Sequence, residues 1–422
     1  MDKANYKSLP PCGGSWRGVI ILGDGMADHK QPALGDKTPL EAANIGLMHQ
    51  LAKLGRTGRL ITVPKGFPPG SEVANTAILG YDLNKVYEGR GPLEAASIGY
   101  EMEKDDLALR CNIISLQDGK IMTHHGGHLQ TADAHVLIDY LNENLAGDYT
   151  IEGKNFSVKF IKGIQYRHLL IIKGGNKNIE CAPPHDHPNE AWQPLLVKGD
   201  KATATLINDL ILKSQALLAA HPYNKQRAAE GKLQANSIWP WSGGYRPSME
   251  TLLSQFPQIK KGSVITAVDL IKGIGHYAGL DIINVEGATG LADTNYEGKA
   301  EAAINALKNG DDFVFVHVEA TDEAGHDGDV NLKVKATEYL NDRIVKPIYD
   351  YIMSVEDNIA IAVLPDHPTP CETRTHVNEP VPFLIWHKGI EPDSVQKYTE
   401  ESCVSGSYGL LRLREFIENF IQ

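Results

Sequence analysis

Short apolar segments that alternate with helical patterns recur near both ends of this 422-residue chain, and they constrain its fold more than any other feature. Residues 18–22 (GVIIL) form an unbroken aliphatic run, and similar runs stand at 312–320 (DFVFVHVEA) and 358–364 (NIAIAVL). Such runs are typical of parallel strands that are buried on both faces. Segments with helical spacing, such as 39–54 and 331–355, separate them. The alternation predicts a doubly wound, mostly parallel α/β sheet.

The middle of the chain differs in character from its two ends. Between about residues 86 and 260 it is more polar, with several short strand patterns and a long amphipathic stretch at 201–220. A chain of this length also exceeds one typical domain. We therefore expect one α/β domain built from residues 1–85 and 261–422, with a smaller α+β domain, residues 86–260, inserted between its halves.

Composition narrows the range of partners. The formal net charge is −12 at pH 7, and no run of Lys or Arg offsets it, which argues against a nucleic-acid partner. The five cysteines are Cys12, Cys111, Cys181, Cys371 and Cys403. They show no CxxC spacing, so we interpret them as reduced thiols. We find no apolar leader and no apolar span of membrane length, and we expect a soluble, cytoplasmic protein without a membrane partner.

Three of the apolar runs end in aspartate or in an aspartate followed by histidine. The carboxyl ends of strands form the active-site crevice in open α/β sheets, so side chains at these ends should converge even when they are distant in sequence. The candidate residues are Asp24, Asp322, His326, Asp366, His367 and His376. Asp322 and His326 are four residues apart, which places them on one face if the segment is helical.

Each of these residues also has an ordinary structural interpretation. An aspartate at a strand end is most often a helix cap or a turn former, and a lone histidine in a loop is most often solvated. The joint pattern is harder to explain in this way, because these residue types recur at three strand ends that should meet. Three carboxylates and three imidazoles suffice for two divalent metal ions, since imidazole suits zinc or manganese and carboxylate suits manganese or magnesium.

The segment 68–82 (PPGSEVANTAILGYD) places a serine directly before a helical pattern. Ser71 could be the N-cap of that helix, since serine is a preferred capping residue. It could also be a nucleophile, because a helix N-terminus presents free backbone N–H groups to a negatively charged group. Two nearby metal ions would favour the second role: one would bind the serine oxygen and lower its pKa, and the pair would hold a phosphoryl group during transfer.

Five segments resemble the cofactor-independent (2,3-bisphosphoglycerate-independent) phosphoglycerate mutases of the archaeal type, in the alkaline phosphatase superfamily. They are GVIILGDGMAD, PPGSEVANTAILGYD, GATGLADTNYEGKAEA, FVHVEATDEAGHDGD and LPDHPTPCETRTHVNEPVPF, and the resemblance covers nearly the whole chain. It implies an alkaline-phosphatase-like catalytic domain with an inserted domain that grips the substrate, and a serine that is phosphorylated transiently. It also implies two divalent metal ions, with Mn²⁺ favoured over Mg²⁺, Zn²⁺ or Co²⁺.

The resemblance also assigns roles to individual residues. Ser71 resembles the nucleophile. The ligands of one metal ion would be Asp24, Ser71, Asp366 and His367. The ligands of the other would be Asp322, His326 and His376. Lys299 matches a lysine that would stabilise the phosphoryl group, although it could equally be an exposed lysine of a helix.

A small phosphorylated carboxylate calls for arginines that can form paired hydrogen bonds with it. The candidates in the expected insert are Arg110, Arg167 and Arg246, each of which could instead form a structural salt bridge. Residues 123–135 (THHGGHLQTADAH) stand where related archaeal-type mutases often carry an arginine-rich segment, so we add His125 as a substrate-binding candidate. This difference does not affect the expected metal and serine chemistry, but it means that the identity of the substrate is not decided by the resemblance.

Several functions compete on this sequence. The leading hypothesis is an isomerase of glycolysis or gluconeogenesis that moves the phosphoryl group of 3-phosphoglycerate to Ser71 and back to the 2-hydroxyl, without ATP or 2,3-bisphosphoglycerate. The alternatives are a homoserine kinase-like phosphotransferase, a metal-dependent phosphomonoesterase and a non-enzymatic binding module, the last of which has no use for two metal sites beside a serine. The chain lacks the GxxxxGK[ST] loop of P-loop kinases. Asp186 is a candidate base on residue type alone, and the oligomeric state is open.

Overall fold

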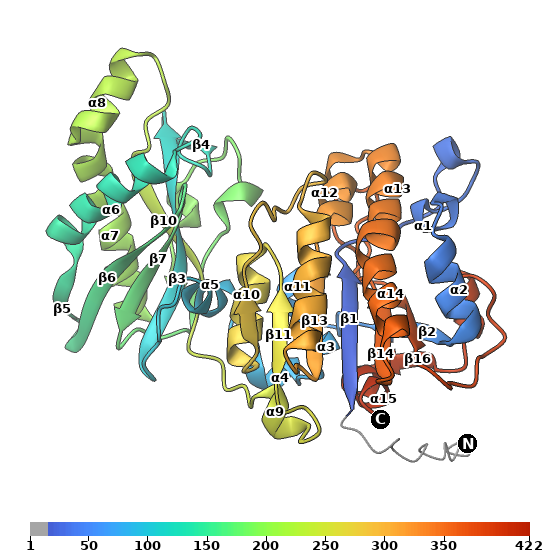
Figure 1. The fold of residues 1–422 in the computed structure, drawn as a ribbon. Coiled ribbons are helices and arrows are strands. Elements are labelled where there is room, and N and C mark those ends of the chain that lie inside the picture. Colours follow the sequence, from blue (N-terminus) through green and yellow to red (C-terminus); the bar gives the residue numbers. More distant parts are fainter. Residues whose placement is uncertain (1–15) are drawn as a thin grey trace. The chain divides into compact units, whose positions relative to one another are not determined.

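The computed structural model describes residues 16–422 and divides into two compact units (Figure 1). The first unit comprises the chain up to Tyr87 together with Met249–Gln422, and the second is Glu88–Ser248. Residues 86–87 and 249–260, which we expected in the insert, fall in the first unit. Cys12 lies outside the described residues, and the four cysteines within them are free thiols.

An eight-stranded sheet organises the first unit within residues 16–422, in the order β12-β11-β13-β1-β14-β15-β2-β16. The strands are β1 (Arg17–Gly23), β2 (Arg56–Ile61), β11 (Gly262–Ile265), β12 (Asp281–Ile283), β13 (Phe313–Val318), β14 (Ile359–Leu364), β15 (Val381–Trp386) and β16 (Gly409–Arg412). Neighbours run parallel except at β15, which is antiparallel to β14 and β2. The predicted α/β class with a mostly parallel sheet is confirmed.

The central strands β13, β1 and β14 are buried along almost their whole length, as their apolar sequences predict. Side chains on both faces of a doubly wound sheet must be apolar, because helices cover both of them. Helices α2 (Gly46–Leu54), α11 (Tyr296–Lys308), α13 (Val330–Tyr339) and α14 (Lys346–Ser354) share one continuous apolar core with these strands. His317 is a polar residue inside this layer, and it is fully buried in β13.

The other helices of the first unit lie in the segments before, between and after the strands (Figure 1). They are α1 (Pro39–Ala42), α3 (Ser71–Ile78), α4 (Leu83–Val86), α9 (Leu252–Gln255), α10 (Asp269–Tyr277), α12 (Ala320–Asp327) and α15 (Glu415–Phe420). The helical pattern at 39–54 is divided between α1 and α2. The pattern at 331–355 is interrupted by a π-helical segment, Leu340–Val345, between α13 and α14. Pro347 at the start of α14 has no N–H to donate, which gives a physical reason for this irregularity.

The second unit has an antiparallel sheet of its own, in the order β10-β3-β7-β6-β5 with β4 beside β3. The strands of this sheet are β3 (Asp106–Gln117), β4 (Lys120–Thr123), β5 (Gly147–Ile151), β6 (Lys154–Ile164), β7 (Arg167–Lys173) and β10 (Ser237–Gly244). Strands β8 (Ile179–Glu180) and β9 (Lys198–Gly199) pair with each other as a separate two-stranded sheet. The helices of the second unit are α5 (Arg90–Ser97), α6 (Thr131–Leu145), α7 (Lys201–Ala220) and α8 (Pro222–Ala229). The amphipathic stretch 201–220 forms α7, and β10 places Trp239 and Trp241 in the core of this unit.

Helix length and composition also bear on membrane insertion. A helix that spans a bilayer needs about 20 consecutive, mostly apolar residues. Among residues 16–422, no helix combines that length with a sufficiently apolar composition.

Candidate active site

The carboxyl ends of three adjacent strands carry most of the candidate residues. In the sheet, β1 lies between β13 and β14 (Figure 1). Asp24 directly follows β1, Asp366 and His367 follow β14, and α12, which begins two residues after β13, carries Asp322 and His326. The parallel direction of the three strands brings distant residues together: the backbone N–H of Gly25 donates to Asp366 Oδ1 at 3.0 Å, across 341 positions of sequence.

One group of ligand-type side chains surrounds Ser71. Ligand atoms of Asp24, Asp366 and His367 lie within 4.8 Å of one another, and all three residues are buried. The Ser71 hydroxyl donates to Asp24 Oδ2 at 3.3 Å and lies 3.2 Å from His367 Nε2. These are the four residues that the family resemblance assigns to the first metal ion.

A second group adjoins the first through His367. Ligand atoms of Asp322, His367 and His376 lie within 4.8 Å of one another. The third predicted member, His326, is close as well: its Nε2 lies 3.2 Å from Asp322 Oδ2 and 2.9 Å from His376 Nε2. Asp322 and His326 share one face of α12, as their four-residue spacing predicted. His367 thus stands between the two groups, a position that the sequence did not reveal.

Ser71 is the first residue of α3 and does not cap it. Gly70 is the N-cap, and glycine has no side chain that could accept a hydrogen bond from the first turn. The capping interpretation of Ser71 is therefore wrong, because the hydroxyl points toward Asp24 and His367 instead. The N-terminus of α3 still presents backbone N–H groups and positive dipole character to an anion attached there.

Two polar residues that the sequence did not single out hold the ligand-type side chains in place. Asn75 donates from Nδ2 to Asp366 Oδ2 at 2.9 Å and to the Ser71 carbonyl at 2.9 Å. Thr369 donates its hydroxyl to Asp322 Oδ1 and lies 3.2 Å from His367 Nδ1. The spacing of Asn75, one helical turn after Ser71, was a signal that could have identified it.

The arrangement suits divalent cations on the grounds of charge. Burial, and then the negative charges of Asp366 and Asp322, raise the pKa of Asp24 well above its usual range. Asp24 Oδ1 is buried and has no hydrogen-bond partner among the described residues. For Asp322, burial acts to raise the pKa, but hydrogen bonds with His326 and His376 outweigh it and hold the pKa well below the usual range. Clustered carboxylates with an unpaired buried oxygen are what a metal ion would neutralise.

Lys299 is buried completely, so its interpretation as an exposed helix lysine is wrong. Its Nζ donates to the carbonyl oxygen of His317 at 3.0 Å. Burial lowers the pKa of Lys299 to about 8, partly opposed by the charge of Glu319. His317 itself places Nε2 3.0 Å from Asp24 Oδ2, although the two atoms are not aligned as a hydrogen bond. Burial also lowers the pKa of this imidazole to about 3.

Known proteins resemble this chain along nearly its whole length. A family model described as 2,3-bisphosphoglycerate-independent phosphoglycerate mutase matches residues 52–224. A protein of that name from Methanosarcina acetivorans is 46% identical over 403 residues, which cover 94% of this chain and 98% of the relative. The chain belongs to the 2,3-bisphosphoglycerate-independent phosphoglycerate mutase family.

Solved structures agree with membership of the mutase family. A protein from Pyrococcus horikoshii is 30% identical, with a TM-score of 0.80, and the match covers 96% of this chain and 97% of that one. A cofactor-independent phosphoglycerate mutase from Thermoplasma acidophilum is 25% identical, with a TM-score of 0.66, and the match covers 96% of this chain and 99% of that one. The fold of the chain, including the inserted unit, is therefore that of the family.

The substrate-binding candidates of this mutase-family chain all lie in the second unit. Arg110, on β3, is buried, and its Nη1 forms an ion pair with Glu94 at 3.0 Å. Its guanidinium also lies over the ring of Trp241, 4.9 Å from the centroid. The structural salt bridge is thus present for Arg110. Burial, and then the nearby cations Arg167 and Arg90, lower the pKa of Arg110, against the effect of Glu94.

The remaining candidates of the second unit are more exposed. Arg167, at the start of β7, lies over the ring of Tyr166, and Arg246 is exposed. His125 is half-buried and stacks on His128, with ring centroids 4.1 Å apart. Asp186 is exposed, and its Oδ1 lies 3.6 Å from His185 Nε2. These positions leave Arg167, Arg246 and His125 near solvent, where a small anion can reach them.

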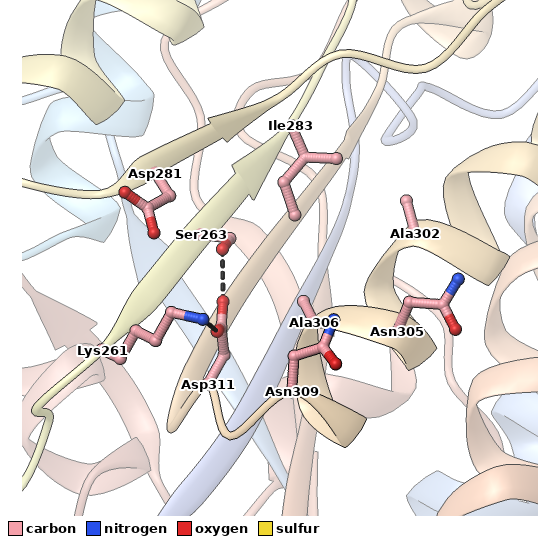
Figure 2. A pocket seen from close by; sticks show the side chains of 9 residues that line it. All are labelled: Lys261, Ser263, Asp281, Ile283, Ala302, Asn305, Ala306, Asn309 and Asp311. Carbon is pink, nitrogen blue, oxygen red and sulfur yellow. Dashed lines mark hydrogen bonds and ion pairs between the residues drawn. The ribbon is translucent and has the colours of Figure 1, made fainter.

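A surface pocket of the first unit lies apart from the candidate residues (Figure 2). It measures about 420 Å³, and Ile283, Ala302 and Ala306 form its apolar wall. Two of its charged residues neutralise one another, since Lys261 Nζ lies 2.7 Å from Asp311 Oδ1. The serine, aspartate and histidine side chains described above do not line this pocket, so the chemistry of the mutase family gives it no role.

Proposed function

We propose that this protein is a cytoplasmic phosphoglycerate mutase that interconverts 3-phosphoglycerate and 2-phosphoglycerate through phosphorylation of Ser71, without 2,3-bisphosphoglycerate. The observation that carries the proposal is the position of the Ser71 hydroxyl, at the N-terminus of α3 and within 3.3 Å of both Asp24 and His367. A nucleophile needs a group that activates it and a place for the charge that it receives. Membership of the mutase family supports the substrate.

Two divalent metal ions belong to this proposal, with Mn²⁺ as the favoured ion. The first would be held by Asp24, Ser71, Asp366 and His367, and the second by Asp322, His326 and His376. Both groups supply mixed carboxylate and imidazole ligands, which suit manganese. When bound, the ions would supply the positive charge that activates the serine oxygen and balances the charge of the phosphoryl group.

The proposed transfer takes place in two steps at Ser71. The bond between phosphorus and the 3-oxygen of the substrate breaks as a bond to Ser71 Oγ forms, and the serine proton is released while the 3-oxygen is protonated. Glycerate then reorients and its 2-hydroxyl loses a proton; the bond between phosphorus and Ser71 Oγ breaks as a bond to the 2-oxygen forms, and Ser71 Oγ takes up a proton. Asn75 fixes Ser71 and Asp366 during both steps, and the N-terminus of α3 faces the anion.

The second unit is proposed to supply the cations that bind the carboxylate and phosphate of the substrate. Its candidates are Arg110, Arg167 and Arg246, together with His125 from the segment that replaces an arginine-rich one. Arg110 is the best placed of these by its surroundings, because Glu94 and the Trp241 ring hold its guanidinium in one orientation.

An assay of products tests the proposed reaction. With Mn²⁺ present and 2,3-bisphosphoglycerate absent, we expect 3-phosphoglycerate to yield 2-phosphoglycerate, detected by coupling to enolase, with little inorganic phosphate. Release of phosphate in excess of 2-phosphoglycerate would instead support a phosphomonoesterase. Homoserine-dependent formation of ADP from ATP, with no isomer formed, would support the kinase-like alternative that the histidine-containing segment 123–135 leaves open.

The buried ammonium of Lys299 predicts a dependence of activity on pH. Because its pKa is lowered to about 8, the group is charged below pH 8 and loses its charge as the pH rises through that value. We expect kcat/KM to fall over the same range if the ammonium stabilises the transferred phosphoryl group. In Lys299→Arg this decline should move to higher pH, because a guanidinium remains charged.

Two further variants separate this role of Lys299 from a structural one. Lys299→Met should lower kcat by roughly 10²- to 10³-fold, the usual effect of losing one group that stabilises transition-state charge. Lys308→Met on the same helix α11 is the control and should match the parent. A parent pH profile without a decline near pH 8, together with activity retained in Lys299→Met, would contradict the assignment.

A further inference from the structure

A buried ion pair lies next to the candidate site, in residues to which the serine and metal chemistry gives no role. Lys333, on α13, and Asp28, in the loop after β1, have fully buried side chains, and Lys333 Nζ lies 2.8 Å from Asp28 Oδ2. Removing two charges from water often costs more free energy than their attraction returns. A contribution to stability alone therefore gives little reason for this buried pair. A role in holding nearby segments in place is the alternative.

The ammonium group of Lys333 is fully hydrogen-bonded, and its partners come from two different loops. Its three protons match Asp28 Oδ2, the Ala27 carbonyl at 3.2 Å and the Thr369 carbonyl at 2.7 Å. Asp28 Oδ2 also accepts from the backbone N–H of Cys371 at 3.1 Å. Lys333 and Asp28 thereby tie the loop after β1 to the loop after β14.

Each of the two loops carries candidate metal ligands. The loop after β1 begins with Asp24, and the loop after β14 contains Asp366 and His367. Thr369, which the pair anchors through its carbonyl, directs its hydroxyl to Asp322 and lies 3.2 Å from His367 Nδ1. The backbone position of Thr369 therefore sets contacts of one carboxylate and one imidazole in the candidate groups.

The close approach of the loops leaves little room for any other register. A Cβ atom on Gly25 would lie 2.5 Å from both Asp322 Oδ1 and Thr369 Oγ1. Gly25 also has a φ of 60°, in the left-handed region that favours glycine. On the other side of Thr369, a Cβ on Gly325 would lie 2.3 Å from the Thr369 carbonyl oxygen. Small shifts of Thr369 would thus be transmitted directly to Asp322 and its helix.

We propose that Lys333 and Asp28 form a positioning pair, which holds the two ligand-bearing loops in register and thereby sets the affinity of the site for divalent metal ions. Neither residue touches the reacting atoms; both act through Thr369. The inference rests on the proposed function in one respect, namely that the site binds metal, and it does not depend on the identity of the substrate. Outer residues that orient metal ligands typically contribute about 10- to 100-fold in affinity.

The double variant Lys333→Met/Asp28→Asn tests the positioning role. It removes both charges at similar volume, so no unpaired charge remains buried, whereas Lys333→Met alone would leave Asp28 without its cation. We expect the double variant to fold with a lower thermal midpoint than the parent, because the Ala27 and Thr369 carbonyls lose the donor Lys333. We also expect Mn²⁺ binding to the metal-free protein, measured by titration calorimetry, to weaken by roughly 10- to 100-fold. In the metal-free protein, hydrogen exchange at the amides of Thr369 and Cys371 should become faster.

Lys261→Met/Asp311→Asn is the control, a pair whose aspartate side chain is buried like that of Asp28 and whose lysine side chain is 48% exposed. This lysine–aspartate pair of the first unit lies just before β11 and β13, and Lys261 Nζ is 2.7 Å from Asp311 Oδ1 (Figure 2). Its carboxylate accepts a further hydrogen bond from the Ser263 hydroxyl, on β11 and away from both ligand-bearing loops. Removal of this pair should leave Mn²⁺ affinity and the exchange of the Thr369 amide unchanged.

The outcomes separate the inference from the proposed function. Parent-like Mn²⁺ affinity and amide exchange in the folded double variant would overturn the positioning role. If the double variant does not fold, Asp28→Asn alone decides by the same two measurements: loss of the carboxylate charge should weaken Mn²⁺ binding and speed exchange of the Thr369 amide, and parent-like values would overturn the positioning role. Failure of the parent to bind Mn²⁺ would overturn the metal centre and the inference with it. Metal binding without mutase activity in the parent would overturn the substrate alone and leave the inference standing.

Discussion

Ser71→Ala should abolish turnover of 3-phosphoglycerate while leaving the fold intact. The loss should be about 10⁴-fold or more, the scale seen when a covalent nucleophile is removed from an enzyme. Stability should change little, because Ser71 does not cap α3 and its hydroxyl contacts Asp24 and His367 rather than the helix backbone. The measurements are kcat by the enolase-coupled assay and the thermal unfolding midpoint of the same preparation.

A hydroxyl lost elsewhere on α3 provides the control for Ser71→Ala. Thr76 is buried on that helix, and its hydroxyl donates to the Glu72 carbonyl rather than to the site. Thr76→Val removes this hydroxyl at nearly constant volume and should retain most of the activity. Substantial turnover in Ser71→Ala would show that another group accepts the phosphoryl group, and the assignment of the nucleophile would fail.

Substitution of His367 should have the second-largest effect, because its imidazole is a proposed ligand of the first metal ion and also lies within 4.8 Å of ligand atoms of Asp322 and His376, which are proposed ligands of the second. We expect His367→Asn to weaken binding of both metal ions and to reduce metal content after gel filtration to well below that of the parent. His326→Asn should affect one ion only, since the His326 imidazole contacts Asp322 and His376, which belong to the second group. Metal content by elemental analysis and Mn²⁺ titration distinguish the two variants.

His387→Asn is the matched control for these histidine variants. His387 follows β15, and its Nδ1 lies 3.0 Å from the Lys388 carbonyl oxygen, away from the candidate ligands. Its substitution should leave both metal content and activity at the parent level. Two metal ions bound with unchanged affinity by His367→Asn would contradict the shared position of this imidazole.

The sequence could predict the convergence of the candidate site because one physical rule applies to all its parts. Asp24, Asp322 and Asp366 each follow an apolar run, and parallel strands present their carboxyl ends at the same edge of a sheet. The four-residue spacing of Asp322 and His326 also predicted that the two side chains share one face of a helix. The α/β class followed from the same runs, because segments without a polar face must be covered on both sides.

Other features depend on contacts that no local pattern records. The run 381–386 reads like the other buried strands, yet β15 is antiparallel, since an apolar run has no direction of its own. His317 lies inside such a run and resembles an ordinary core residue in sequence. Lys333 and Asp28 are 305 positions apart, and each looks like a solvated charge on its own segment. Lys299 is similar, because helical spacing alone did not show that its ammonium is buried.

The most direct test of the account is to find where the phosphoryl group resides during turnover. The Mn²⁺-loaded protein would be mixed with 3-phosphoglycerate, quenched in acid within a fraction of the turnover time and mapped by peptide mass spectrometry, with free phosphate and 2-phosphoglycerate measured in the same samples. We predict one phosphoryl group on Ser71 and accumulation of 2-phosphoglycerate with little free phosphate. Turnover with Ser71 unmodified, or with the phosphoryl group on a different residue, would contradict the account.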